Sequence, residues 1–187
     1  MPEVYVFDFF GEVGSQVKSP AIRYLNGYLA QCAVPKQPPL RAWFWSWDPE
    51  PGDFDVLIFV VPRGQAHEVM KLKFPSVPDR RGRNGWTHFV NGGGDEAVSL
   101  VYSNELDAQT LAMVIFHEIM HNKLQLNNEL HAQGGLASEC VGAGCKPAVT
   151  GLNKDNILRM RDALVRRRIA QWKSGASLVF QKSQGLI

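Results

Sequence analysis

Residues 117–121 read HEIMH, two histidines four positions apart with a glutamate directly after the first. In an α-helix, positions four apart lie one above the other on the same face, so both imidazoles can bind one metal ion. Glu118 is rotated by about 100° around the helix axis, which keeps its carboxylate beside a metal-bound water instead of on the metal. The segment therefore predicts His117 and His121 as zinc ligands and Glu118 as the general base.

A catalytic zinc site has three protein ligands and an open position for water, so the chain must supply one more ligand. His131 is the first candidate, because the backbone can turn back after residues 127–128 and the glycines at 134–135 permit a tight loop. Glu139 is the alternative third ligand, and Asn127 is a weaker one. One Zn²⁺ ion per chain is the predicted cofactor.

The motif lies within residues 109–126, which contain no glycine or proline and are apolar almost all round. This composition predicts a buried helix, and Asp107 is placed to cap its N-terminus. Buried histidine and glutamate side chains without partners would each cost on the order of a few kcal/mol, and zinc coordination supplies a partner. The alternative is a chance match to the motif, in which the histidines are an ordinary core or surface pair.

Four segments before the motif are rich in β-branched and aromatic residues and predict strands: residues 4–9, 41–47, 55–61 and 97–102. The third contains VLIFVV, which predicts a central strand that is covered on both faces. A helix is expected between the first two strands, with Ser19 as N-cap and Pro20 at its first position. Residues 75–94 are rich in Pro, Gly and Arg and are expected to form a long surface loop.

The composition changes after the motif helix. Residues 131–151 are mostly small and predict irregular structure, and an amphipathic helix is expected over about residues 154–173. The apolar face of that helix is predicted to carry Ile157, Met160, Leu164, Ile169 and Trp172.

With these elements in this order, the chain resembles the zincin-type zinc metallopeptidases over most of its length, and a divergent metzincin-like member in particular. The resemblance implies an α+β, zincin-like fold. Such a fold has a small mixed twisted sheet, an N-terminal backing helix, a buried active-site helix and a loop-rich C-terminal part that ends in a long amphipathic helix. It also implies a single catalytic domain over residues 1–187, with an upper part of about 1–127 and a lower part of 128–187.

The chain departs from the metzincin pattern HExxHxxGxxH, since Leu124 stands at the glycine and Asn127 at the third histidine. If His131 is the ligand, the motif helix would run about one turn longer than in those enzymes. Ala137 would then lie near the position of the sulfur in their methionine turn. If Glu139 is the ligand, the chain is more similar to gluzincins.

The resemblance implies hydrolysis of a peptide bond in a protein or peptide substrate by a zinc-activated water, with Glu118 as the base. Many such enzymes stabilise the oxyanion with a downstream tyrosine or histidine, but no tyrosine follows Tyr102 and no histidine follows His131. Arg159, Arg161 and upstream side chains remain the candidates. The family resemblance also places strand 97–102 at a sheet edge, where an extended peptide could pair with it.

These departures support an alternative function, a catalytically weak or inactive zincin-fold module that binds a partner protein. An exchangeable water on the metal would count against that alternative, because a binding module is expected to have a closed four-ligand site or no metal.

The composition of the 187 residues, 45% hydrophobic and 20% charged with a net charge of +2, is that of one folded, soluble unit. The charge is too small to indicate a nucleic-acid or membrane partner. The arginines of residues 80–83 and 166–168 are read as solvated. No apolar run is long enough for a membrane helix, and the start lacks a signal-peptide pattern. The expected location is the cytoplasm, or export without a standard signal peptide, and the oligomeric state stays open.

The chain contains only three cysteines, Cys32, Cys140 and Cys145, which is typical of a reducing compartment. Cys32 is expected to be a small core residue. Cys140 and Cys145 are expected to be free thiols or one local disulfide, in preference to ligands of a second metal.

Overall fold

The computed structural model describes residues 3–8, 10–45, 56–61, 84–89, 97–103, 106–142, 145 and 149–166. Its strands are β1 (Glu3–Asp8), β2 (Arg41–Trp45), β3 (Val56–Val61), β4 (Gly85–Phe89) and β5 (Ala97–Tyr102). Its helices are α1 (Ser15–Gln31), α3 (Ala108–Leu124) and α4 (Lys154–Arg166), with two short 3-10 helices, η2 (Asn128–Gln133) and η3 (Gly135–Ala137). The expected α+β class with a mixed sheet is therefore confirmed. None of the described helices is long and apolar enough to span a membrane.

The strands form one five-stranded sheet in the order β2-β1-β3-β5-β4. Strands β2, β1, β3 and β5 are parallel, and β4 runs antiparallel to β5 at one edge. All six residues of β3 are buried, as the VLIFVV run predicts. Val56, Ile58 and Val60 belong to the main core, whereas Leu57, Phe59 and Val61 belong to a second apolar cluster. Because successive strand residues point to opposite faces, both faces of the sheet are covered.

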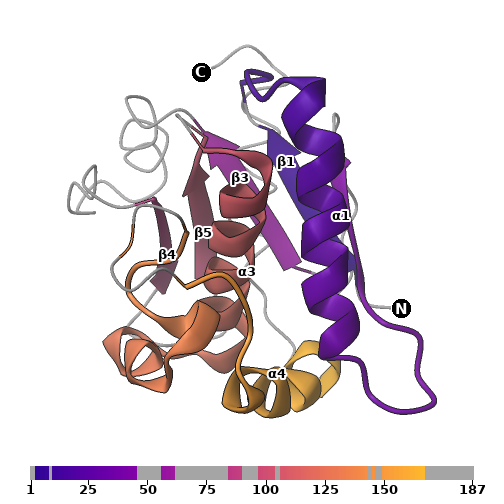
Figure 1. Ribbon diagram of the computed structural model, residues 1–187, viewed down its shortest axis with the longest axis vertical. Coiled ribbons are helices and arrows are strands. Elements are labelled where there is room, and N and C mark those ends of the chain that lie inside the picture. Colours follow the sequence, from indigo (N-terminus) through magenta and orange to yellow (C-terminus); the bar gives the residue numbers. More distant parts are fainter. Residues whose placement is uncertain are drawn as a thin grey trace.

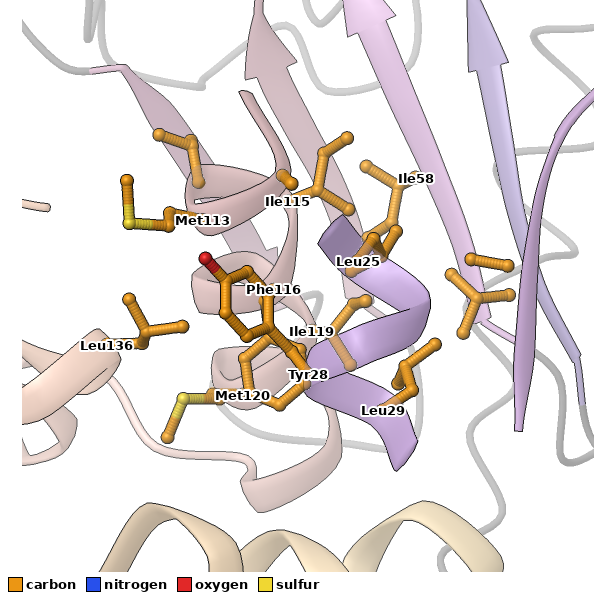
Figure 2. Close-up of a cluster of buried hydrophobic side chains, with 14 of the residues drawn as sticks. Leu25, Tyr28, Leu29, Ile58, Met113, Ile115, Phe116, Ile119, Met120 and Leu136 are labelled. Carbon is orange, nitrogen blue, oxygen red and sulfur yellow. The ribbon is translucent and has the colours of Figure 1, made fainter. Parts of the chain in front are cut away.

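Helices α1 and α3 pack side by side on one face of the sheet, and α4 crosses near their lower ends in the view of Figure 1. Figure 2 shows the apolar contact between them, where Leu25, Tyr28 and Leu29 of α1 meet Phe116, Ile119 and Met120 of α3. Leu136 of η3 closes the same cluster from the other side of α3. The motif helix is thus enclosed by the sheet, α1, α4 and the segment that follows it, which explains why it is apolar almost all round.

The start of α3 agrees with the sequence. The Asp107 carboxylate accepts hydrogen bonds from the Thr110 backbone N–H at 2.8 Å and from the Thr110 hydroxyl at 2.9 Å. The backbone hydrogen bond of Thr110 is the main cause that lowers the pKa of Asp107. The expected N-cap is therefore confirmed.

The structure corrects three expectations. Residues 85–89 form strand β4, although their segment was expected to be a surface loop. Pairing with β5 satisfies the backbone groups of β4 that face it, and this tertiary contact outweighs a composition rich in turn residues. Consequently β5 lies between β3 and β4 and is not the edge strand. The rest of residues 75–94 lies outside the described residues.

The third correction concerns α1, which begins at Ser15, with Gly14 as its N-cap and Pro20 inside the helix. Proline in this position removes one intrahelical hydrogen bond. The earlier start follows from the turn before the helix, where the Asp8 carboxylate accepts the backbone N–H groups of residues 11–13 at 3.0–3.2 Å. The turn ends at Gly14, the N-cap, whose carbonyl accepts hydrogen bonds from the backbone N–H groups of Val17 and Lys18.

Asp8 joins β1 to α1, and we expect Asp8→Asn to lower the free energy of unfolding by about 2 kcal/mol. The side chain is 3% exposed, accepts three backbone hydrogen bonds and forms an ion pair with Lys18 at 2.8 Å. Urea unfolding measures the change. Lys18→Met, which removes only the half-buried ion-pair partner, should cost about 1 kcal/mol or less. Equal losses in the two variants would contradict the structural role of the three backbone hydrogen bonds.

Candidate metal centre

Two histidines of α3 lie on one face of the helix in the middle of the core. His117 is 6% exposed and His121 is 9% exposed. Their Nε2 atoms are 2.9 Å apart, and their ring centroids are 4.6 Å apart. The spacing of four residues on a helix therefore brings both imidazoles to one point, as the sequence predicts.

His131 reaches the same point from η2. Its Nε2 is 3.2 Å from Nε2 of His121, and its ring stacks on that of His117 with centroids 5.4 Å apart. The ligand atoms of the three histidines all lie within 4.8 Å of one another, and this is the group of residues that could hold a metal ion within the described part of the chain. Glu139 is described and exposed, and it does not belong to the group.

The other ring nitrogen of each helix histidine contacts a backbone carbonyl. His117 Nδ1 lies 2.7 Å from the Leu136 oxygen, and His121 Nδ1 lies 2.6 Å from the Leu126 oxygen. A carbonyl oxygen only accepts hydrogen bonds, so both Nδ1 atoms carry the proton and both Nε2 atoms present a lone pair. Two lone pairs at 2.9 Å repel each other unless a cation lies between them. Carbonyl contacts of this kind orient histidines that bind metals.

The donor set fits a transition metal. A tetrahedral ion with Zn–N bonds of about 2.0–2.1 Å holds its ligand nitrogens about 3.3 Å apart, and the observed separations are 2.9 Å and 3.2 Å. Imidazole ligands suit Zn, Cu, Fe and Ni, whereas Ca and Mg prefer oxygen. Three neutral imidazoles also leave the full charge of the ion available to polarise a further ligand.

The chain returns to the histidines through a sharp bend after α3. The helix ends at Leu124, and Gln125 adopts a left-handed conformation with φ 55°, which turns the Leu126 carbonyl toward His121. The motif helix is therefore not one turn longer than the metzincin pattern, and His131 is carried by a separate 3-10 helix. Gly134 follows at φ 64° and ψ −168°, a region that is essentially restricted to glycine.

Two asparagines at the start of α4 hold this returning segment. Asn153 Nδ2 donates to the Gln133 carbonyl at 2.8 Å, and Asn156 Nδ2 donates to the Gly134 carbonyl at 3.1 Å. The same pair caps α4, because Asn153 Oδ1 accepts the Asn156 backbone N–H at 2.8 Å. Asn156 is completely buried. The helix α4 is thereby tied to the segment that carries the third histidine.

Glu118 lies on the neighbouring face of α3 and is 2% exposed. Its Oε2 accepts a hydrogen bond from the Thr87 hydroxyl of β4 at 2.6 Å. The carboxylate does not belong to the group of ligand atoms formed by the three histidines. It is thus held against the sheet edge, next in sequence to a histidine of the site but outside the cluster itself.

Four polar residues around the site are not among those predicted from the sequence, and all are nearly or fully buried: Thr87, Ser99, Asn122 and Asn156. The sequence contains a signal for two of them, because Ser99 is a polar residue within the apolar strand AVSLVY and Asn122 is a polar residue within an almost wholly apolar helix.

The arginines proposed as oxyanion donors lie on α4, with Arg159 exposed and Arg161 half-buried. Arg161 lies near Cys32, whose pKa burial raises to about 12 even though the arginine charge opposes that shift.

Cys140 and Cys145 form a disulfide. This outcome agrees with the local bridge considered from the sequence, and it removes both residues as candidate ligands of a second metal. Cys32 is a buried free cysteine in the core, as expected.

The described residues therefore offer a three-histidine group that could hold one metal ion and, on the next face of the same helix, a buried carboxylate. A metal that polarises water and a carboxylate that takes its proton are the two parts of metal-assisted hydrolysis. Comparison of the chain with protein-family models, with curated proteins and with solved structures gives no match.

Proposed function

We propose that this protein is a zinc-dependent metallopeptidase of the zincin type, in which His117, His121 and His131 bind one Zn²⁺ and Glu118 is the general base. The observation that carries the proposal is the convergence of three imidazole Nε2 atoms, two of which have Nδ1 committed to carbonyl oxygens. A cation between these nitrogen lone pairs would remove their mutual repulsion. In the HEIMH segment, Glu118 follows the first of these histidines directly and could act on a water bound to that cation.

When bound, zinc would polarise the scissile carbonyl and lower the pKa of a water in its open position to about 7. Glu118 would accept the proton of that water and deliver it to the leaving amine. Leu126 and Leu136 contribute only their carbonyl oxygens, which keep the imidazoles in the tautomer that presents Nε2. Burial of Glu118, His117 and His121 limits the access of bulk water to the reacting groups.

The fold supports the zincin assignment in three respects. The helix that carries the motif is buried and packs on the sheet beside the backing helix α1. An antiparallel edge strand, β4, lies next to Glu118. The segment with Leu136 and the completely buried Ala137 passes next to His117, where metzincins have the methionine turn. The histidine third ligand favours the metzincin-like form over the gluzincin-like one.

The experiment that tests the proposal combines metal analysis with an activity screen of the purified, folded protein. We expect one zinc per chain and cleavage of members of a quenched-fluorescence peptide library of random sequence. A chelator should abolish the cleavage, and added zinc should restore it. A folded protein that takes up no zinc would refute the metal site. One tightly bound zinc without cleavage, in a site without exchangeable water, would favour the alternative of a module that binds a partner protein.

Asn156 gives a prediction about the third ligand. Asn156→Ala removes the hydrogen bond to the Gly134 carbonyl and frees the segment that carries His131. We expect zinc affinity to fall about 10- to 100-fold, which is typical when an outer partner of a ligand is lost. A competition titration with a chromogenic chelator measures the change.

Asn26→Ala is the matched control, because the Asn26 side chain also hydrogen-bonds to backbone groups distant in sequence, the N–H and the carbonyl of Ala42. It should reduce stability without changing zinc affinity. An unchanged affinity in Asn156→Ala would show that the α4 contacts do not position the ligand segment.

A further inference from the structure

Helix α3 presents a second pair of residues four positions apart, Glu118 and Asn122, on the face next to that of His117 and His121. Glu118 is 2% exposed and Asn122 is fully buried. Both side chains meet polar residues of the sheet: Thr87 on β4 contacts Glu118, and Ser99 on β5 contacts Asn122. The two strands that carry Thr87 and Ser99 are neighbours on one side of the sheet, where β4 forms the edge (Figure 1).

The four side chains form one continuous chain of hydrogen bonds. Thr87 Oγ1 is 2.6 Å from Glu118 Oε2, Ser99 Oγ is 2.9 Å from Thr87 Oγ1, and Asn122 Nδ2 is 3.1 Å from Ser99 Oγ. An ionised carboxylate only accepts, so the single hydroxyl proton of Thr87 goes to Glu118. Thr87 must then accept from Ser99, which accepts from the Asn122 amide. Every donor in this chain therefore points toward the carboxylate.

The register of the sheet brings these groups together. Thr87 and Ser99 are directly opposite in the antiparallel pair β4–β5. A hydroxyl pair across two strands is a stable combination, and here both residues are buried and both hydroxyls bond to side chains of α3. The separation of 2.6 Å between Thr87 and Glu118 is that of a charge-assisted hydrogen bond. The position of the carboxylate is thus determined by β4 and β5 as well as by its own helix.

Gly85 provides a second, independent contact between β4 and Glu118. Gly85 and Thr87 lie two residues apart, on the same face of the strand. A Cβ at residue 85 would lie 2.5 Å from Glu118 Oε1 and 2.9 Å from Val114 Cγ1. The edge strand therefore leaves room for one carboxylate oxygen at Gly85 and binds the other at Thr87.

We propose that Thr87 is a positioning residue for Glu118. Its hydroxyl holds the Glu118 carboxylate on β4, apart from the three imidazoles. This inference rests on the proposed function, in which Glu118 is the base. Without the Thr87 hydroxyl, Oε2 of the carboxylate loses its 2.6 Å hydrogen bond to β4, and we expect the carboxylate to shift from the place where it meets the water. Displacing a reacting group by about 1 Å costs about 100-fold in rate.

The first test compares Thr87→Val, which keeps the shape but removes the hydroxyl, with Thr87→Ser, which keeps the hydroxyl. Each zinc-loaded protein is assayed on the peptide that the wild type cleaves fastest in the random library. We expect Thr87→Val to bind one zinc and to lose about 10- to 100-fold in kcat with an unchanged KM, and Thr87→Ser to recover most of kcat. Wild-type kcat in folded Thr87→Val would overturn the proposal.

Thr110→Val is the matched control, because Thr110 is also a buried threonine whose hydroxyl donates to a carboxylate, that of Asp107, at 2.9 Å. It should destabilise the protein without changing kcat. Should Thr87→Val not fold, Gly85→Ala tests the same point, since its new methyl group displaces Glu118 and leaves Thr87 intact. Gly27→Ala, where an added Cβ meets nothing within 4 Å, is the control for that variant. A wild-type kcat in Gly85→Ala would also contradict the proposal.

A second readout does not depend on activity. Crystal structures of the zinc-loaded wild type and Thr87→Val should show the Glu118 carboxylate bonded to Thr87 in the first and displaced from β4 in the second. The same carboxylate position in both structures would overturn the inference. If the wild type cleaves no library peptide, the proposed function fails, and the two crystal structures still decide whether Thr87 positions Glu118.

Discussion

Glu118→Gln is expected to retain one zinc per chain and to lose hydrolysis of the library peptide by about 100- to 10,000-fold in kcat. The glutamine amide can still accept from Thr87 at the position of Oε2, so the side chain keeps its place on β4. It cannot take a proton from water, and the base is therefore removed without removing the fold or the ligands. Elemental analysis and initial rates on the same preparations measure both effects.

Glu129→Gln is the matched control, because Glu129 is an exposed glutamate on η2, close in sequence to His131. It should keep the wild-type rate and zinc content. Undiminished hydrolysis in Glu118→Gln would refute the assigned base, even if the zinc site itself were intact. A loss of zinc in Glu118→Gln would instead indicate that the carboxylate takes part in holding the metal.

His131→Ala should abolish stoichiometric zinc binding and, with it, all hydrolysis. His131 supplies one of three converging nitrogens, with its Nε2 3.2 Å from that of His121. Loss of a ligand should reduce affinity by more than the roughly 10- to 100-fold that loss of an outer partner costs. The side chain is only half-buried on a 3-10 helix, so the substitution should leave the core folded. Zinc content after dialysis, with circular dichroism as the check of folding, measures the result.

Glu139→Ala distinguishes the two third ligands weighed from the sequence. Glu139 is exposed and lies outside the histidine group, so this variant should bind one zinc and keep the wild-type rate. The opposite pattern, in which Glu139→Ala loses zinc and His131→Ala keeps it, would reverse the ligand assignment and make the chain more similar to gluzincins. Loss of zinc in both variants would indicate a closed four-ligand site and would support the binding-module alternative.

Much of the fold follows from local patterns in the sequence. The composition of residues 109–126 predicts a buried helix with Asp107 as N-cap, and α3 has both properties. The apolar run of β3 predicts a central strand, and β3 lies between β1 and β5. These features depend on residues that are close together in the chain, where helical and strand periodicity express themselves directly. For the same reason, the convergence of His117 and His121 is already implied by their spacing.

The incorrect predictions concern features that depend on contacts which local sequence patterns do not show. Strand β4 was missed because its five residues are flanked by residues typical of loops, and only pairing with β5 stabilises them as a strand. The edge position given to β5 was wrong for the same reason. The early start of α1 depends on the hydrogen bonds that Asp8 makes with residues 11–13, which residue preferences do not reveal.

By itself, the sequence determined the first half of the candidate site, two histidines and a glutamate on one helix, because residues four apart on a helix share a face whatever surrounds them. It left the third ligand open between His131 and Glu139. Only the tertiary structure brought His131 to the other two, through the bend at Gln125 and the asparagines of α4. Only the tertiary structure placed Thr87 against Glu118, across 31 residues of chain. Such contacts form between segments distant in sequence, and their geometry depends on how the whole core packs.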